Sequence, residues 1–391
     1  MKNTKNKKTC SACGTSPVNH TFLLIDNFLN ETLGKFMMYF FNAYKNRRLA
    51  RYVEIMLYTF LRMIGMASYN TDISKVVSGR GELVWIEARK RGLRMEQIKI
   101  FNRYIDNYRV FINGGVYYFE SIPIPPHLNQ YGYTWVDDKL ILSKKLNKNN
   151  INSPKTFLAI TERGALKAFD KLEKPIIIKP KNGSRGRHTT TNINTKEELI
   201  KAFRLGKQIS FTLVLQEHLY GSVCRATIVG DELVGFFKAL PPQITGDGKQ
   251  NIEALIIEKN KNKNEKLGDI LINEELINFI TRQGYTLASI LENGKTIDLI
   301  AKTGRLYGGH TREMINEIHP KIHQIFQKAA KIIQAPVAGF DIIIEDPTKD
   351  PDLQKWGIIE CNSLPFIDLH YYAEEGPRIN PAEKIWDLWN K

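Results

Sequence analysis

A short apolar run that opens into a small, basic loop is the feature that most constrains this chain. Ile176–Ile178 is β-branched and typical of a buried strand, and it leads directly into Lys179. Glycines in the next few residues allow a ligand to approach the backbone closely, and free N–H groups in such a turn attract anions. The segment is therefore a candidate cradle for nucleotide phosphates, although it lacks the residue order of a P-loop. An ordinary strand end followed by a polar turn is the alternative. The candidate loop residues are Gly183, Ser184, Arg185 and Gly186.

Two apolar segments near the end of the chain carry polar side chains. Ala338–Ile344 reads as a strand with Asp341 among apolar residues, and Ile358–Asn362 reads as another. Glu360 and Asn362 are two residues apart, so both side chains leave the same face of that strand. Burying such polar groups in an apolar environment costs several kcal/mol of folding free energy unless a partner compensates them. Since Mg²⁺ prefers a few oxygen ligands together with phosphate oxygens, the sequence predicts a Mg²⁺–nucleotide site here.

From Trp135 to about Leu388 the chain resembles the ATP-grasp ligases, most closely the ATP-grasp half of cyanophycin synthetases and the similar module of fused glutathione synthetases. The resemblance implies an α+β ATP-grasp fold, in which two α/β subdomains clasp the nucleotide. Several ordered, spaced segments make a more specific match than any one of them alone. The matching segments are 138–139, 174–187, 220–225, 240–248, 255–260, 338–341, 359–365, His370 and 375–378.

The resemblance also implies roles for individual residues. Lys139 and Lys179 are expected to bind the nucleotide phosphates, and Arg225 to bind a phosphate or a substrate carboxylate. The family usually places a Glu five residues before the glycine at position 221, where it contacts adenine. Gln216 occupies that position here and Glu217 follows it, so either residue is a candidate for the adenine contact. The corresponding Mg²⁺ ligands are Asp341, Glu360 and Asn362, and two Mg²⁺ ions are expected, with Mn²⁺ as an alternative ion.

Residues 301–310 depart from the cyanophycin synthetase pattern. A Gly-Gly pair is kept, but the preceding Asn and Ser positions hold Gly304 and Leu306. Lys302 and Arg305 remain candidates for stabilising oxyanion charge. The substrate is therefore expected to differ from that of cyanophycin synthetases. His370 matches the family, and a packed or substrate-gating histidine is as good an interpretation as a catalytic one.

The activity that the resemblance implies is ATP-dependent, ADP-forming ligation of a carboxylate to an amine through an acyl-phosphate. The sequence stops near the end of the ATP-grasp body, so a muramyl-ligase-type half like that of cyanophycin synthetases is not expected. We therefore expect one kind of amide bond, made from amino acids or acidic peptides. The alternative is a nucleotide-binding regulatory or partner protein that has lost turnover, which the altered segment 301–310 and Gln216 both motivate.

The composition of the chain is basic, with a formal net charge of +15. This charge favours anionic partners, but much of the excess is scattered lysine, which also serves solubility. No interleaving of aromatic and basic residues indicates nucleic-acid binding. The apolar stretches 22–41 and 53–67 contain charges and should not span a membrane. We therefore expect a cytoplasmic protein without a membrane span, with a homo-oligomer and a monomer both open.

The expected organisation is a flexible tail at 1–20, a helical segment at 21–71, a small α/β domain at 72–134 and an ATP-grasp domain at 135–391. The tail carries Cys10 and Cys13 in a C-x-x-C pattern with His20 nearby, which fits either a zinc site or free, reduced thiols. Further expected elements are two amphipathic helices within 21–67, a helix at 82–91, strands at 97–105 and 108–119 with a turn at 113–115, an exposed loop at 259–268 and a helix at 311–334.

Overall fold

The structure is a computed structural model that describes residues 10–13, 19–25, 27, 29, 47–128, 134–181, 187–265 and 267–390. Part of the expected N-terminal tail and most of the first expected amphipathic helix lie outside these residues. The loop residues Gly183, Ser184, Arg185 and Gly186 also lie outside them. The nucleotide-binding role of that loop therefore stays a prediction.

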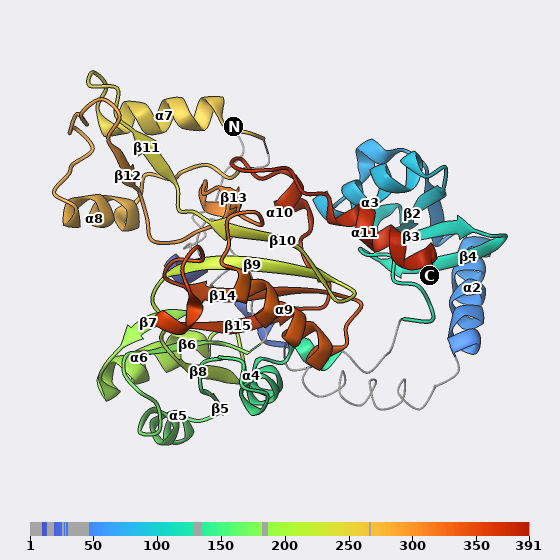
Figure 1. The fold of residues 1–391 in the computed structure, drawn as a ribbon, viewed down its shortest axis with the longest axis horizontal. Helices are drawn as coiled ribbons and strands as arrows, with labels where there is room; N and C mark the ends of the chain where they lie inside the picture. The colour runs from blue at the N-terminus through green and yellow to red at the C-terminus, as the bar shows by residue number, and fades with distance from the viewer. Residues whose placement is uncertain are drawn as a thin grey trace.

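A five-stranded antiparallel sheet forms the centre of the molecule (Figure 1). One face of this sheet packs against helices α4 (Lys139–Lys148) and α9 (Pro320–Ile333), and Phe326 and Phe340 meet in that core. The expected strands at 338–344 and 358–362 are confirmed. The strand order is β13 (Thr311–Glu313), β10 (Glu232–Ala239), β9 (Ser222–Val229), β14 (Val337–Ile344) and β15 (Trp356–Asn362).

A four-stranded antiparallel sheet lies below the central sheet in Figure 1. Helices α5 (Glu162–Phe169) and α6 (Lys196–Gly206) cover one of its faces, where Ile176, Ile178 and Leu215 are buried. Ile176 and Ile178 belong to the strand predicted from the sequence. The strand order is β5 (Thr156–Ala159), β8 (Leu213–Glu217), β6 (Ile176–Pro180) and β7 (Thr190–Ile193).

A lobe with its own apolar core lies at the upper left of Figure 1. It consists of β11 (Gln243–Thr245), β12 (Thr296–Asp298), α7 (Ile252–Asn262) and α8 (Glu274–Arg282). The expected exposed loop at 259–268 is wrong in its first part, because α7 continues to Asn262. Lys259 donates to the carbonyl of Gln243 at 2.6 Å, and the Asn260 side chain bonds both backbone groups of Ile270, so these polar residues stabilise the helix end.

The small sheet on the right of Figure 1 has four antiparallel strands in sequence order. The turn predicted at 113–115 is confirmed, but the single strand expected at 97–105 is wrong. Phe101 and Asn102 take left-handed backbone angles and form a second hairpin turn, which apolar alternation alone does not reveal. The elements are β1 (Ala67–Asn70), β2 (Arg94–Ile100), β3 (Arg103–Ile112), β4 (Gly115–Glu120), α2 (Arg47–Met63) and α3 (Gly79–Lys90).

The C-terminal segment packs on this small sheet. Helix α11 (Pro381–Asp387) brings the indole N–H of Trp386 to the carbonyl of Val84 at 3.0 Å, and the two residues share one core. This core therefore joins residues on both sides of the expected boundary at 134/135. The helix expected at 311–334 is also shorter than predicted: 311–313 is strand β13, and α9 begins only at Pro320, which occupies the first turn that proline favours.

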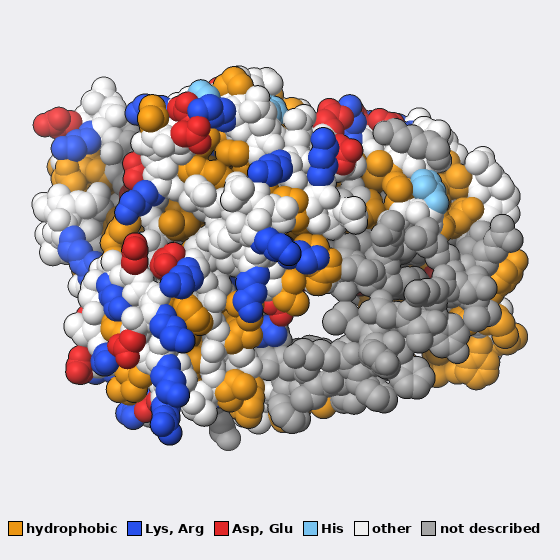
Figure 2. Space-filling view, turned by 60° about the horizontal axis from the view of Figure 1, so that its bottom comes forward, with side chains coloured by type: hydrophobic (Ala, Val, Ile, Leu, Met, Phe, Trp, Pro, Cys, Tyr) orange, Lys and Arg blue, Asp and Glu red, His pale blue; other side chains and the backbone are white. Residues whose placement is uncertain are grey.

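The basic surplus is spread over the surface that Figure 2 shows. Lys and Arg side chains are distributed over the left half of this face, with acidic side chains among them. Within the described part of the chain, no helix is long and apolar enough to cross a bilayer.

Replacing Gly221 with Ala is expected to destabilise the fold by about 1–3 kcal/mol more than the same change at Gly284. Both glycines have positive φ, +129° and +84°. A Cβ on Gly221, between β8 and β9, would lie 2.5 Å from the backbone C and O atoms of Ile344, whereas a Cβ on Gly284 would meet nothing within 4 Å. Denaturant unfolding of both variants measures the difference, and equal losses would contradict the steric argument.

Candidate active site

Three neighbouring strands of the central sheet place charged side chains in one row. Arg225 on β9 lies directly opposite Asp341 on β14, and Asp341 lies directly opposite Glu360 on β15. Asn362 follows two residues after Glu360, opposite Gly339. Directly opposite residues share a face of a sheet, so these four side chains leave the face opposite to the one that α4 and α9 cover.

Arg225 and Asp341 form a bidentate ion pair. The Arg225 Nη2 atom donates to Asp341 Oδ2 at 2.8 Å, and Nε donates to the other oxygen. Burial alone would lower the pKa of Arg225, but the adjacent Asp341 carboxylate raises it overall. Arg225 Nη1 and Asn362 Nδ2 are buried and have no hydrogen-bond partner among the described residues. Oxygen atoms of a phosphate or carboxylate ligand would satisfy such donors.

Two lysines from other elements reach the same row. Lys139 is the first residue of α4, whose N-terminus is capped by Asp138, and its Nζ lies 3.5 Å from Glu360 Oε2. Lys179 comes from β6 in the second sheet. Desolvation lowers the pKa of Lys179 to about 8, with Lys139 adding to this effect and Glu360 and Asp341 opposing it. The two lysines and the two carboxylates therefore act on one another electrostatically.

ATP binding in the absence of a divalent ion is expected to weaken as the pH rises through the Lys179 pKa of about 8. Only the ammonium form attracts phosphate oxygens, so the apparent affinity should fall about tenfold from near pH 7 to near pH 9. Calorimetric titration across this range measures the fall. Lys179→Arg keeps its charge throughout and should flatten the profile. A profile of equal slope in both proteins would contradict the assignment.

Two acidic residues, Asp137 and Asp138, hold the start of α4 in place next to this row. Asp137, at the end of a 3₁₀ turn (Thr134–Asp137), accepts from the backbone N and the hydroxyl of Ser363 at 2.9 and 2.7 Å. Lys181 Nζ lies 3.2 Å from Asp138 Oδ2. The start of α4 is thus tied both to the residue that follows β15 and to the residue that follows β6. The signal available in the sequence is the adjacent acidic pair of Asp137 and Asp138, but it does not show what Asp137 contacts.

The register of β8 separates the two candidates for the adenine contact. Gln216 is 1% exposed and shares a face with Ile177 and Thr156, and its amide donates to Thr156 Oγ1 at 2.7 Å. Lys179 lies on that same face, because it pairs with position 214, two residues before Gln216. The neighbouring Glu217 points to the other face, and its carboxylate accepts from the backbone N of Lys155 at 3.1 Å.

Three further candidates are not members of this row, although His370 lies over the same face of the sheet, where it packs edge-on against Phe237, the residue opposite Arg225. Lys302 pairs with Glu275 on α8 at 2.9 Å, in the lobe that contains α7 and α8. Arg305 donates to the carbonyl of Tyr372 at 2.6 Å and lines a pocket against the start of α3. His370 is fully buried between Thr227 and Glu313, with its Nε2 atom 2.7 Å from Thr227 Oγ1. His370 is therefore a packed histidine.

The comparisons with known proteins agree with the resemblance seen in the sequence. The bifunctional glutathione biosynthesis protein GshAB of Clostridium perfringens is 30% identical over 267 residues, which cover 65% of this chain and 34% of that protein. The cyanophycin synthetase of Synechocystis is 30% identical over 236 residues, covering 56% of this chain and 27% of that protein. The chain thus spans about a quarter to a third of the length of these relatives. No family model matches it.

Solved structures agree on the fold. The crystal structure of a bifunctional glutathione synthetase from Pasteurella multocida matches with a TM-score of 0.59 and 21% identity, over 80% of this chain and 44% of that one. The predicted α+β ATP-grasp fold is therefore confirmed.

Proposed function

We propose that this chain is an ATP-dependent, ADP-forming ligase that joins a carboxylate to an amine. The observation that carries the proposal is the convergence of Lys139 and Lys179, from two separate elements, on the row of Arg225, Asp341 and Glu360. A metal-bound triphosphate needs positively charged side chains for its phosphate oxygens and side-chain oxygens for its metal ions. The similarity to GshAB and cyanophycin synthetase supports the assignment.

In this proposal the nucleotide lies between the two sheets. Lys179 on β6 and Lys139 at the start of α4 bind its phosphates, and Gln216, which shares the Lys179 face, contacts the adenine. Gln offers a neutral amide, so it can hydrogen-bond the base without adding charge. The loop at 183–186 is proposed to cover the phosphates.

The donor set fits Mg²⁺. Asp341 and Glu360 supply carboxylate oxygens and Asn362 an amide oxygen from adjacent strands, the oxygen ligands that this ion prefers. We propose two ions, with Mn²⁺ as an alternative. When bound, the metal neutralises phosphate charge and polarises the γ-phosphoryl group. Arg225 donates to both oxygens of Asp341, so it would share that carboxylate with the ion.

The proposed reaction has two steps. A carboxylate oxygen of the substrate attacks the γ-phosphorus, which gives an acyl-phosphate and ADP, and an amine then displaces phosphate to form the amide. Lys139, Lys179 and Arg225 hold the phosphate oxygens and stabilise the charge that develops during transfer. The protein thus contributes position and charge and forms no covalent bond to the substrate.

The pocket that contains Arg305 is the proposed place for an amino-acid substrate. It combines Arg305 with Glu82 and Asp368 and lies against the N-terminus of α3. Opposite charges within one pocket suit a zwitterion. Arg305 pairs with Asp368 at 3.4 Å, so a substrate carboxylate would share Arg305 with Asp368, and the amine would meet an acidic side chain. Amino acids or short acidic peptides are the proposed substrates, and the use of ATP makes the cytoplasm the proposed location.

A phosphate-release screen tests the proposal. The full chain is incubated with ATP, Mg²⁺ and pairs drawn from amino acids and short acidic peptides, and products are identified by mass spectrometry. The expected result is release of ADP and phosphate that requires both a carboxylate and an amine, with a new amide as product. Nucleotide binding without turnover across the panel would instead favour a regulatory or partner protein.

A further inference from the structure

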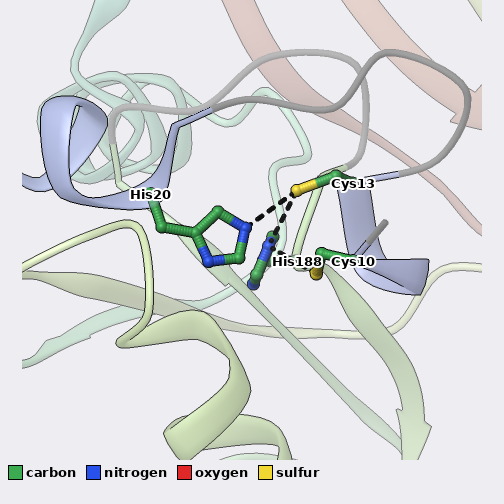
Figure 3. Close-up of side chains that lie close together, drawn as sticks. All are labelled: Cys10, Cys13, His20 and His188. Atoms are coloured by element: carbon green, nitrogen blue, oxygen red, sulfur yellow. Dashed lines mark hydrogen bonds between the residues drawn. The ribbon is translucent and has the colours of Figure 1, made fainter. Parts of the chain in front are cut away.

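Four metal-binding side chains meet at the N-terminal end of the described chain. Cys10, Cys13, His20 and His188 point toward one another (Figure 3), and one ligand atom of each lies within 4.8 Å of all the others. The N-terminal sequence contains only three of these residues, which leaves zinc and a free tail as alternatives. His188 supplies the fourth, from the segment between β6 and β7.

The distances within this cluster fit a shared metal ion. Cys13 Sγ lies 3.1 Å from His20 Nε2 and 3.3 Å from His188 Nε2, and Cys10 Sγ lies 3.6 Å from His188 Nε2. In a tetrahedral zinc site, bond lengths of about 2.3 Å to sulfur and about 2.0–2.1 Å to nitrogen separate the ligand atoms by roughly 3.3–3.8 Å. Small adjustments would therefore place an ion at bonding distance from all four atoms.

The surrounding structure orients the ligands. His188 Nδ1 lies 2.8 Å from the carbonyl of Leu205, and a bond donated there leaves Nε2 free to bind a metal. The backbone N of His188 donates to the carbonyl of Ala12 at 3.1 Å, and that of Cys13 to the carbonyl of Cys10 at 3.0 Å. Cys13 and His188 are 3% and 1% exposed, so the cluster is built into the fold.

The backbone conformation of His188 indicates that the surrounding structure holds its side chain in one particular position. Its φ is +49°, a left-handed value that is uncommon for residues other than glycine. Such strain persists where the surrounding structure imposes it. Here the conformation directs the imidazole to the two cysteines while the backbone N–H bonds the tail.

We propose that Cys10, Cys13, His20 and His188 form a structural Zn²⁺ site that fastens the N-terminal segment to the subdomain containing β6 and β7. Two thiolates and two imidazoles are a ligand set that zinc favours. Four protein ligands leave no open position, so the site is structural and not catalytic. The inference does not depend on the proposed ligase activity.

The site would close a long loop of chain. Cys13 and His188 are 175 residues apart in the sequence. Among the described residues that follow the tail, buried Asn27 donates to the carbonyl of Ile209 at 2.8 Å and adds a further contact. Joining such distant segments through a metal stabilises the folded chain, because the ligands are not preassembled in the unfolded state. We expect the N-terminal segment to become sensitive to protease when zinc is removed.

Metal analysis of the full chain, purified under reducing conditions without a histidine tag, tests the site. The expected result is one zinc per chain by elemental analysis after reconstitution with Zn²⁺ alone and gel filtration. Substitution by Co²⁺ should give the intense visible bands of tetrahedral coordination and a thiolate-to-cobalt charge-transfer band. This spectrum is recorded on the unmutated chain, so it tests the proposed site even if a variant fails to fold.

Matched variants locate the metal. Cys10→Ser and His188→Gln should each reduce the retained zinc from one equivalent to near zero, whereas His323→Gln on α9 should retain it. An unmutated, reduced chain that retains no zinc would overturn the proposal. Full zinc content in the His188→Gln variant would also overturn it, because the ion would then be held elsewhere.

Discussion

Replacing Glu360 with Gln is expected to reduce ligation about 1,000-fold while the protein stays folded. Glu360 lies beside Lys139 and opposite Asp341, and its side chain is 27% exposed, so its loss removes a charge from the site without opening a core. Loss of one group that stabilises transition-state charge typically costs two to three powers of ten, and loss of a metal ligand belongs in the upper part of that range. The phosphate-release rate at saturating ATP and Mg²⁺ measures the effect.

Glu345→Gln is the matched control. Glu345 is exposed just after β14, so the same chemical change there should leave the rate within about twofold. A Mg²⁺ titration distinguishes the loss of a metal ligand from the loss of a charge. A lost metal ligand should raise the Mg²⁺ concentration needed for half-maximal rate. Full turnover in the Glu360→Gln variant would remove Glu360 from the site and, with it, the proposed arrangement of ligands.

Strands β14 and β15 of this row, and strand β6 that carries Lys179, could be predicted because they are short, apolar and bear or border polar residues. Ile176–Ile178 and 338–344 show that pattern clearly, and both are strands. The expected strand at 97–105 failed because a turn made by Phe101 and Asn102 has no glycine or proline to mark it. The helix expected at 311–334 failed at its start, where the edge strand β13 pairs with β10 in a contact that the local sequence does not encode.

The parts of the site that escaped prediction depend on contacts between distant segments. His188 joins Cys10 and Cys13 across about half of the chain, and nothing around His188 in the sequence distinguishes it from a loop histidine. The choice between Gln216 and Glu217 needed the register of β8, since adjacent residues in a strand point to opposite faces. Lys302 was a candidate by chain position alone, and its ammonium instead pairs with Glu275.

His370 illustrates how a matched histidine can serve the fold. Its ring fits against Gly235, where a Cβ would lie 2.5 Å from Nδ1, and it packs edge-on against Phe237. Its partner Glu313 is also fully buried, and one oxygen of that carboxylate accepts from the backbone N of Phe236 at 2.7 Å and of Ile315 at 3.2 Å. This carboxylate therefore satisfies buried donors on three residues.

Replacing Glu313 with Ala is expected to lower the free energy of unfolding by about 3–5 kcal/mol. The change leaves His370 and two backbone N–H groups without their acceptor in a buried environment, and each unsatisfied group costs about 1–3 kcal/mol. Denaturant unfolding followed by fluorescence measures the loss. Glu313 is the β13 end of the same cross-strand row, but Phe237 separates it from Arg225 and its partner is His370, so the activity of the fraction that remains folded should change little.

Two comparisons separate this structural role from a catalytic one. Glu313→Gln keeps an acceptor oxygen for the backbone donors, so it should be less destabilised than Glu313→Ala. Glu232→Ala removes an exposed carboxylate that pairs with Lys384 on the surface, and such pairs contribute at most about 1 kcal/mol. If Glu313→Ala unfolded like Glu232→Ala but lost turnover selectively, His370 and Glu313 would have to act on the substrate, and the packed interpretation would be wrong.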